Sequence, residues 1–305
     1  MKRILLLISI LSAVLISCTL STTPAMRPND VYFLSVACAY IGDYSGAREL
    51  EGTLNDQTFL DRQLEYLASQ SDSSYHAYLL QNGTVDGSLQ NESDRNLITV
   101  KQDGTVITQN DIAPEDFIAG FRDTVRLIAS EAEADDVLIF HYSGHGNDDG
   151  GLCLPEGSRG YSVLSLAELV SLLGEVKCDG RLVMLDSCYS GNIVTDSDTD
   201  SRQSLADLFS PYEGSVSSFW FSAASSPDEL SWSADFNGVD LGIHTARVLN
   251  ALGFDLTSMS AGRRDPDYVS FNRIISRLAA VEVPSRTQHY TSSESIRDLV
   301  IFNFQ

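Results

Sequence analysis

The chain has 305 residues, a formal net charge of −22 from 42 acidic and 20 basic residues, and five cysteines. A field this negative repels nucleic acid and anionic lipid head groups and attracts cations or basic peptides, so we exclude nucleic acid as a partner. Five cysteines with no Cys-x-x-Cys pair exclude a disulfide-rich scaffold and give no sign of a zinc site.

Residues 1–17 predict an export signal. Two basic residues precede an apolar run, 4–16, which is too short to span a bilayer comfortably. The segment ends in "LISC", which resembles a bacterial lipobox, in which the cysteine, here Cys18, is lipidated and becomes the new N-terminus. An ordinary signal peptide cleaved nearby is the alternative. We predict an exported protein, lipid-anchored in a bacterial cell envelope, with residues 18–30 as a polar tether.

The remaining residues, 31–305, predict one α/β domain. Alternation of strands and helices is typical of a mostly parallel sheet with helices on both faces. Apolar β-branched runs predict strands, and apolar residues at helical spacing predict helices. In chain order we expect a strand at 31–40, a helix at 50–70, a strand at 75–80, a hairpin within 97–109, a helix at 113–134, a strand at 135–146, a helix at 165–176, strands at 180–188 and 217–224, helices at 242–253 and 268–282, and a last strand at 297–304.

Two successive strands joined by a helical crossover end in "HYSGHG" (141–146) and "DSCYSG" (186–191). Ligands of open α/β sheets bind beyond the carboxyl ends of the strands, so parallel neighbours would place His145 and Cys188 over one edge. A cysteine beside an imidazole suits acyl transfer, in which the thiolate attacks a carbonyl and the imidazole protonates the leaving amine. The amides of Gly146 and Cys188 would donate to the developing oxyanion.

These two motifs resemble the His and Cys motifs of the caspase-like cysteine peptidases, specifically the metacaspase and bacterial caspase-homologue branch. The resemblance extends to "LEGTLND", to "FSAASSPDELSW" followed by "GIHTARVLNAL", and to "TQHYTSSESIRDLVIF". His244 stands where phenylalanine is usual, and Tyr290 stands in place of a proline. The resemblance covers residues 31–305 and implies a caspase-like three-layer sandwich, with a large-subunit-like part (31–195), a linker (196–210) and a small-subunit-like part (211–305).

The resemblance also implies a cysteine endopeptidase with Cys188 as nucleophile and His145 as general acid and base. The branch holds a substrate Arg or Lys with acidic residues, and the matching positions here are Asp56 and Asp186, with Ser143 as a further lining residue. Two carboxylates in one cleft suit a guanidinium, which can bond bidentately. The alternative interpretation is that Asp56 caps a helix and Asp186 solvates a loop.

Arg202 is the one basic residue of the predicted linker, so self-cleavage within residues 192–206 is a natural hypothesis if the enzyme cuts after Arg. Arg263 and Arg264 offer a second exposed target. We expect peptide or protein substrates with basic residues, and a monomer. A catalytically silent caspase-like lipoprotein that acts as a binding scaffold is the rival function. A transpeptidase is a third hypothesis, since amines also resolve a thioester.

No cofactor is required by this chemistry, and calcium is kept as a hypothesis. Several metacaspases are activated by calcium through acidic residues after the His motif, which makes Asp148 and Asp149 the candidates. The acidic segment 196–207 resembles an EF-hand only in part, because Ser201 replaces the turn glycine, and we interpret it as a solvated loop. A disulfide among three other cysteines is left open for an exported protein: Cys38, Cys153 and Cys178.

Overall fold

The computed structural model describes residues 29–41, 48–50, 52–85, 92–156, 160–178, 180–193, 219–281, 288–292 and 298–304. The predicted signal segment, Cys18, most of the predicted tether and the predicted linker with Arg202 lie outside the described residues. No described helix is long and apolar enough to cross a membrane.

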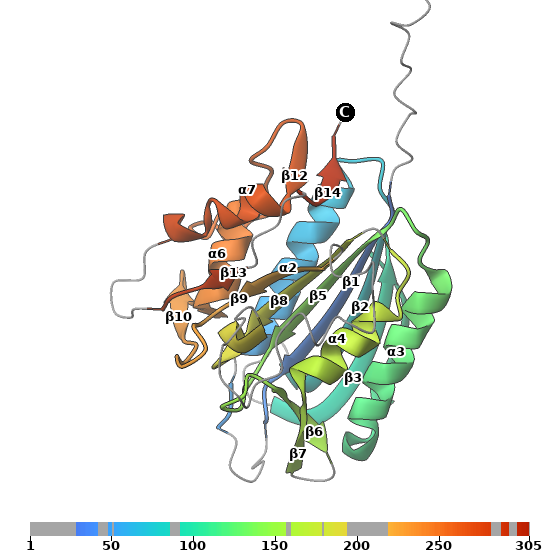
Figure 1. The fold of residues 1–305 in the computed structure, drawn as a ribbon, viewed down its shortest axis with the longest axis vertical. Coiled ribbons are helices and arrows are strands. Elements are labelled where there is room, and N and C mark those ends of the chain that lie inside the picture. The colour runs from blue at the N-terminus through green and yellow to red at the C-terminus, as the bar shows by residue number, and fades with distance from the viewer. Residues whose placement is uncertain are drawn as a thin grey trace, which may run out of the picture.

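The centre of the fold is an eight-stranded sheet (Figure 1), whose strands are β1 (Val31–Cys38), β2 (Tyr75–Val85), β3 (Glu92–Gln102), β4 (Thr105–Ile112), β5 (Val137–Ser143), β8 (Gly180–Asp186), β9 (Phe219–Ala223) and β13 (Thr291–Ser292). Their order across the sheet is β13-β9-β8-β5-β1-β2-β3-β4. Strands β1, β2, β5, β8 and β9 are parallel to one another, whereas β3, β4 and β13 pair antiparallel at the two edges. The predicted α/β class with a mostly parallel central sheet is confirmed.

Helices cover both faces of this sheet, which gives three layers (Figure 1). One apolar core lies between the sheet and α3 (Phe117–Glu131) and α4 (Leu166–Gly174). The other lies between the opposite face and α2 (Gly52–Ala68), α6 (Ile243–Leu252) and α7 (Phe271–Ile275). The central strands are buried on both faces, which explains why β1, β5 and β8 are continuous apolar runs in the sequence.

Local sequence signals account for several element ends. Ser165 caps α4 by accepting a hydrogen bond from the Glu168 amide at 3.2 Å. Gly253 ends α6 in the left-handed conformation, at φ 110°. The predicted hairpin forms between β3 and β4, and its turn residues Asp103 and Gly104 both have positive φ, as a two-residue turn of this kind requires.

The predicted helix over 268–282 is wrong in its first part. Tyr268–Ser270 form a short strand, β12, which pairs antiparallel with β14 (Val300–Asn303), and only α7 and a 3-10 turn at Leu278–Ala280 follow as helix. Asp298 accepts hydrogen bonds from the Ser270 hydroxyl and the Asn272 amide. This long-range pairing overrides the local helical spacing, and the predicted last strand, β14, lies in this two-stranded sheet and not in the central one.

Two further hairpins were not foreseen: β6 (Leu152–Glu156) with β7 (Gly160–Leu164), and β10 (Ser233–Phe236) with β11 (Val239–Gly242). Both consist of strands of four or five residues, too short to show a clear period in sequence. They lie near the carboxyl ends of the central strands, and the second hairpin contributes Ser233, Asp240 and Gly242 to the cavity described next.

Candidate active site

The ends of β5 and β8 bring the two predicted catalytic residues together. These strands are parallel neighbours, and their last residues, Ser143 and Asp186, are register partners. His145 and Cys188 each follow two residues later, and both line one cavity of about 550 Å³. The structure therefore places a thiol and an imidazole on the wall of the same cleft, beyond the carboxyl ends of parallel strands.

The imidazole of His145 is oriented by the main chain. Its Nε2 lies 2.7 Å from the carbonyl oxygen of Arg48. A carbonyl oxygen can only accept, so Nε2 must carry the proton and donate it. Nδ1 is then the nitrogen that can take a proton from a thiol, as a general base requires.

Two buried tyrosines hold the backbone of His145. The His145 amide donates to the Tyr40 hydroxyl at 3.2 Å, and the Tyr142 hydroxyl donates to the His145 carbonyl at 2.8 Å. The Tyr40 ring also lies 4.8 Å from the imidazole, centroid to centroid. Tyr40 has a positive φ of 53°, an uncommon backbone conformation for a bulky residue. These contacts fix where the imidazole can point.

Cys188 is half-buried in the cleft, whereas the other described cysteines are buried. Burial raises the pKa of its thiol and the charge of Asp186 raises it further, while the Ser231 amide and its own amide act in the opposite direction. The thiol is therefore poised to be deprotonated by a neighbouring base rather than to ionise alone. Cys38, Cys153 and Cys178 form no disulfide among the described residues.

The backbone of Gly146 lies directly against Cys188. A Cβ added at Gly146 would sit 2.2 Å from the Cys188 carbonyl oxygen, closer than any real Cβ comes, so only glycine fits. The next residue, Tyr189, is anchored by its amide to the Glu229 carbonyl at 2.8 Å and has a positive φ of 57°. The Gly146 and Cys188 main chains thus meet beside the thiol, where the predicted oxyanion donors are needed.

Asp56 lies deep in the same cleft, 1% exposed, in the second turn of α2. It accepts hydrogen bonds from the Ser143 hydroxyl at 2.6 Å and from the Gly242 amide at 2.8 Å. Burial, and next the charge of Asp186, raises the pKa of Asp56 well above its usual value. Asp56 does not cap α2, which begins at Gly52, but it accepts a hydrogen bond from the amide of Gly242, the N-cap residue of α6.

Asp186 lies beside it, 5% exposed, at the end of β8. It accepts two hydrogen bonds from Thr245, from the amide and the hydroxyl, both at 2.9 Å, and one from the Ser231 hydroxyl at 2.7 Å. A Cβ at Gly242 would meet an oxygen of Asp186 at 2.1 Å and one of Asp56 at 2.9 Å, so the two carboxylates converge on one point. The alternative that Asp186 solvates a loop is therefore wrong.

The described residues form no ion pair between either carboxylate and a lysine or arginine. Arg247, whose charge interacts with Asp186, donates instead to the carbonyl oxygens of Gln288 and Val281. The cleft thus contains two buried acidic groups that form no ion pair with a lysine or arginine of the described chain. Burial of charge without such a partner is costly and is typical of binding and catalytic sites.

The candidate calcium ligands Asp148 and Asp149 are both exposed. Within the described ranges no three His, Cys, Asp or Glu side chains come together in a way that could hold a metal ion. Calcium binding at these two residues stays a prediction.

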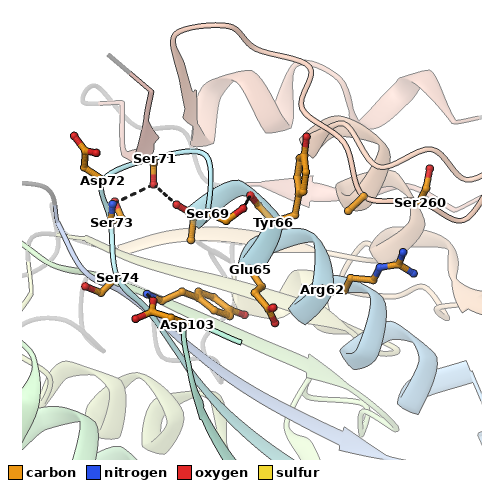
Figure 2. A pocket seen from close by; sticks show the side chains of 13 residues that line it. Arg62, Glu65, Tyr66, Ser69, Ser71, Asp72, Ser73, Ser74, Asp103 and Ser260 are labelled. Carbon is orange, nitrogen blue, oxygen red and sulfur yellow. Dashed lines mark hydrogen bonds between the residues drawn. The ribbon is translucent and has the colours of Figure 1, made fainter. Parts of the chain in front are cut away.

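A second cavity, of about 690 Å³, lies at the other end of the strands (Figure 2). It is lined by the last turns of α2 and by residues 71–75, which lead into the start of β2, and its labelled side chains include Arg62, Glu65, Tyr66 and Asp103. It contains neither His145 nor Cys188, and ligands of such sheets bind at the opposite end. We assign it no catalytic role.

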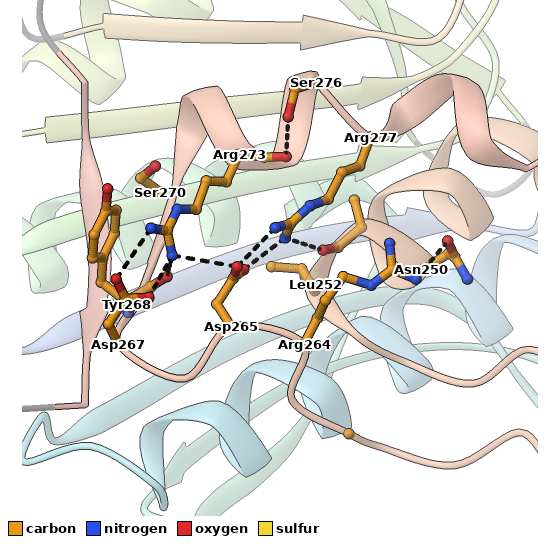
Figure 3. A network of polar contacts seen from close by, with 12 residues as sticks. Asn250, Leu252, Arg264, Asp265, Asp267, Tyr268, Ser270, Arg273, Ser276 and Arg277 are labelled. Carbon is orange, nitrogen blue, oxygen red and sulfur yellow. Dashed lines mark hydrogen bonds and ion pairs between the residues drawn. The ribbon is translucent and has the colours of Figure 1, made fainter.

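Arg263 and Arg264 are exposed, as predicted, but the segment that carries them is fastened to the molecule (Figure 3). The guanidinium of Arg263 lies over the Phe304 ring, 4.7 Å from its centroid. Asp265, which follows Arg264, forms a bidentate ion pair with Arg277 at 2.6 and 2.7 Å. Cleavage after either arginine would require these contacts to open.

The sequence model of the caspase domain matches residues 38–260, which is more than half of the chain. The chain therefore belongs to the caspase domain family, a family of cysteine peptidases with protein substrates. No curated protein matches the chain. The narrower assignment to the metacaspase branch stays a prediction.

Sequence reasoning missed several residues that support the site: Tyr40, Tyr142, Thr245, Ser231 and the Arg48 carbonyl. Arg48 contacts His145 through its main-chain carbonyl, which every residue type has, so its sequence identity does not indicate this role. Thr245 and Ser231 stand within the segments "GIHT" and "ELSW", which carry the family resemblance. The resemblance does not indicate that both residues contact Asp186. The two tyrosines resemble ordinary core residues in sequence.

Proposed function

We propose that this protein is an active cysteine endopeptidase that cleaves peptide bonds after Arg or Lys. The observation that supports this most directly is the cavity itself, in which His145 and Cys188 share walls with Asp56 and Asp186. The first pair supplies a base and a nucleophile. The second pair supplies negative charge within the same cavity, where the side chain of the residue before the cleaved bond would bind.

Catalysis begins with transfer of the Cys188 thiol proton to Nδ1 of His145. The thiolate attacks the substrate carbonyl carbon, and the amides of Gly146 and Cys188 donate to the resulting oxyanion. His145 then gives its proton to the leaving amine, the C–N bond breaks, and a thioester remains on Cys188. Water, deprotonated by His145, attacks the thioester, releases the acid product and restores the thiol.

Specificity for a basic residue follows from charge and hydrogen-bonding capacity. A guanidinium presents several donors in one plane, and an acidic pair can accept two or more of them. Entry of the cation would also lower the raised pKa of Asp56, because an opposite charge favours the ionised carboxylate. The formal charge of −22 supports attraction of basic segments from a distance.

Three further proposals rest on the sequence alone. The chain cleaves itself after Arg202, in a linker that offers a basic residue. It is exported and anchored through a lipid on Cys18, at the face of a bacterial envelope membrane. Calcium, held by Asp148 and Asp149, raises its activity.

The test compares the protein from residue 19 onward with its Cys188→Ala variant on fluorogenic peptides that end in Arg, Lys or Asp, with and without calcium. We expect cleavage after Arg and Lys that is lost in Cys188→Ala. If no peptide is cleaved in a Cys188-dependent way, the rival function of a silent binding scaffold is favoured. Cleavage after Asp would overturn the assignment of the acidic pocket.

A further inference from the structure

A buried row of polar side chains crosses the sheet directly below the acidic pocket. Ser35 on β1 and His141 on β5 are register partners, and Ser222 on β9 belongs to the same row. All three are at most 2% exposed, on the sheet face covered by α2 and α6. The surrounding core on this face is apolar, so each of these groups must be hydrogen-bonded to be tolerated there.

Hydrogen bonds connect this row to Asp186. The Gln57 amide donates to the Ser35 hydroxyl at 3.2 Å, and Ser35 lies 2.9 Å from Nδ1 of His141. On the other side of the ring, Nε2 lies 3.4 Å from the Thr245 hydroxyl, which donates to Asp186 at 2.9 Å. The chain therefore runs from Gln57 on α2 along the covered face of the sheet, through Ser35 and His141, to Thr245 on α6 and into the pocket.

The directions of these bonds follow from what each group can do. A carboxylate only accepts, so the Thr245 hydroxyl spends its proton on Asp186 and can only accept from His141. His141 must then carry its proton on Nε2, and its Nδ1 accepts the proton of Ser35. The links from Ser35 through His141 to Asp186 therefore have consistent donors and acceptors, whereas the Gln57 amide shares its two protons among the Ser35 hydroxyl and the carbonyl oxygens of Ser35 and Leu80.

His141 is neutral in this network. Burial, and then the charge of neighbouring His244, lowers the pKa of His141 to about 3. Burial likewise lowers the pKa of His244 to about 4. Neither ring therefore supplies a positive charge to Asp186 at neutral pH, so the carboxylate is oriented by donors but keeps its capacity for a substrate cation.

We propose that Thr245 and His141 are specificity-determining positioning residues, which hold the Asp186 carboxylate in the orientation that binds a substrate's basic side chain. This inference rests on the proposed function, because it concerns the same pocket. The two carboxylates are fixed differently: Asp56 is held by Ser143 and Gly242 within the cleft. Asp186 is held by Ser231 and the Thr245 amide and, in addition, by the Thr245 hydroxyl, which ends a chain that passes through the core. Loss of that chain should change substrate preference without disabling the thiol.

The test uses Thr245→Val, which keeps the shape and removes the hydroxyl, and Thr245→Ser, which restores it. The substrates are matched peptides ending in Arg or in citrulline, its neutral isostere. In Thr245→Val we expect the Arg-over-citrulline ratio of kcat/KM to fall by about 10- to 100-fold, mainly through KM, since a hydrogen bond to a charged group is lost. Thr245→Ser should recover the ratio, and His141→Phe should lower it less than Thr245→Val.

Thr124→Val is the matched control, because Thr124 is also buried but donates to the Gly120 carbonyl on α3, on the other face of the sheet. It should leave the ratio unchanged. The rate at which iodoacetamide alkylates Cys188 should be the same in all variants. An unchanged ratio in Thr245→Val would overturn the inference, as would a loss of alkylation that parallels the loss of cleavage, which indicates a merely structural role.

A binding measurement separates this inference from the proposed function. p-Aminobenzamidine, a fluorescent aryl amidine, should bind the full-length Cys188→Ala protein, bind at least tenfold more weakly when Thr245→Val is added, and regain affinity with Thr245→Ser. If the Cys188→Ala protein binds the amidine with the expected dependence on Thr245 but the protein with Cys188 cleaves no peptide, the peptidase function is refuted and the inference stands. Equal binding by all three proteins would refute the inference alone, and no binding by any would refute both.

Discussion

The imidazole of His145 donates through Nε2 to the carbonyl oxygen of Arg48, 2.7 Å away. The bond fixes both the tautomer and the tilt of the ring, and it leaves Nδ1 without a proton, as the proposed general base requires. Because the acceptor is a main-chain atom, no substitution removes it. Its contribution has to be tested through the side chains that hold His145 in place.

Tyr40→Phe removes the hydroxyl that accepts the His145 amide and keeps the ring beside the imidazole. We expect kcat to fall by about tenfold with little change in KM, since the lost bond positions the base and does not touch the substrate.

Tyr78→Phe is the control for that variant. The Tyr78 hydroxyl is likewise hydrogen-bonded, but to Glu131 at the end of α3. If kcat falls equally in both variants, the loss comes from removing a buried hydroxyl anywhere in the protein. That result would refute the positioning role of Tyr40.

Gly242→Ala should block the acidic pocket, because the new methyl group would lie 2.1 Å from an Asp186 oxygen and 2.9 Å from an Asp56 oxygen. We expect kcat/KM for an Arg peptide to fall by more than about 100-fold while Cys188 is still alkylated at the normal rate. Gly120→Ala on α3, where the methyl would meet only side-chain atoms, serves as the matched control. Full activity of Gly242→Ala would mean that substrates do not enter between the two carboxylates.

Much of this arrangement was predictable from sequence, because strong signals carry it. The buried runs of β5 and β8, followed at once by polar and glycine residues, predict the strand ends, and the parallel pairing of these strands then brings His145 and Cys188 together. The acidic pocket was predictable through the family resemblance, which singled out Asp56 and Asp186.

The supporting contacts were not predictable, since they join residues that are far apart in the chain. Tyr40 and His145, or Thr245 and Asp186, meet only after the sheet and α6 have packed. The segment 268–282 shows the same limit in the fold: its helical spacing is real, but pairing of Val269 with Phe302 decides its conformation. Local pattern determines such a segment only where no distant partner competes.

The two buried histidines, His141 and His244, should make the protein less stable from about pH 6.5 downward, the value at which an unfolded histidine titrates, whereas the raised pKa of Asp56 acts in the opposite direction. The pKa values of His141 and His244 are lowered to about 3 and 4 in the folded state, so between these values and 6.5 the unfolded chain binds more protons. Stability then falls as pH falls, by up to about 1.4 kcal/mol per pH unit for each histidine.

Urea unfolding at pH 7, 6 and 5 measures this slope, and His244→Phe, which restores the residue usual in the family, should reduce it. His244 lies close to Asp186, so the variant isolates its titration only if activity at pH 7 is retained. An identical slope in the parent and His244→Phe would contradict the buried neutral state of this ring.

Arg277→Ala should loosen the segment that carries Arg263 and Arg264 (Figure 3). It leaves Asp265, whose side chain is 8% exposed, with only the longer contact to Arg273, at 3.3 Å. We expect a loss of about 1–3 kcal/mol in the free energy of unfolding, discounted from a fully buried pair because Arg277 is partly exposed. In the active enzyme, new fragments ending at Arg263 or Arg264 should appear in mass spectra.

Cys188→Ala in the same background controls for other proteases, since it should abolish those fragments. A loosened but uncut Arg277→Ala protein would show that the segment is protected by something other than this ion pair.

The most direct test of the account is the kcat/KM of the Arg peptide relative to its citrulline counterpart, measured for the parent and for Asp186→Asn, with Cys188→Ala as the blank. If the two buried carboxylates bind the substrate cation beside an active dyad, the parent prefers Arg and the preference falls by about 100-fold or more in Asp186→Asn. The account is contradicted if the parent shows no Cys188-dependent preference for Arg, or if Asp186→Asn keeps that preference in full.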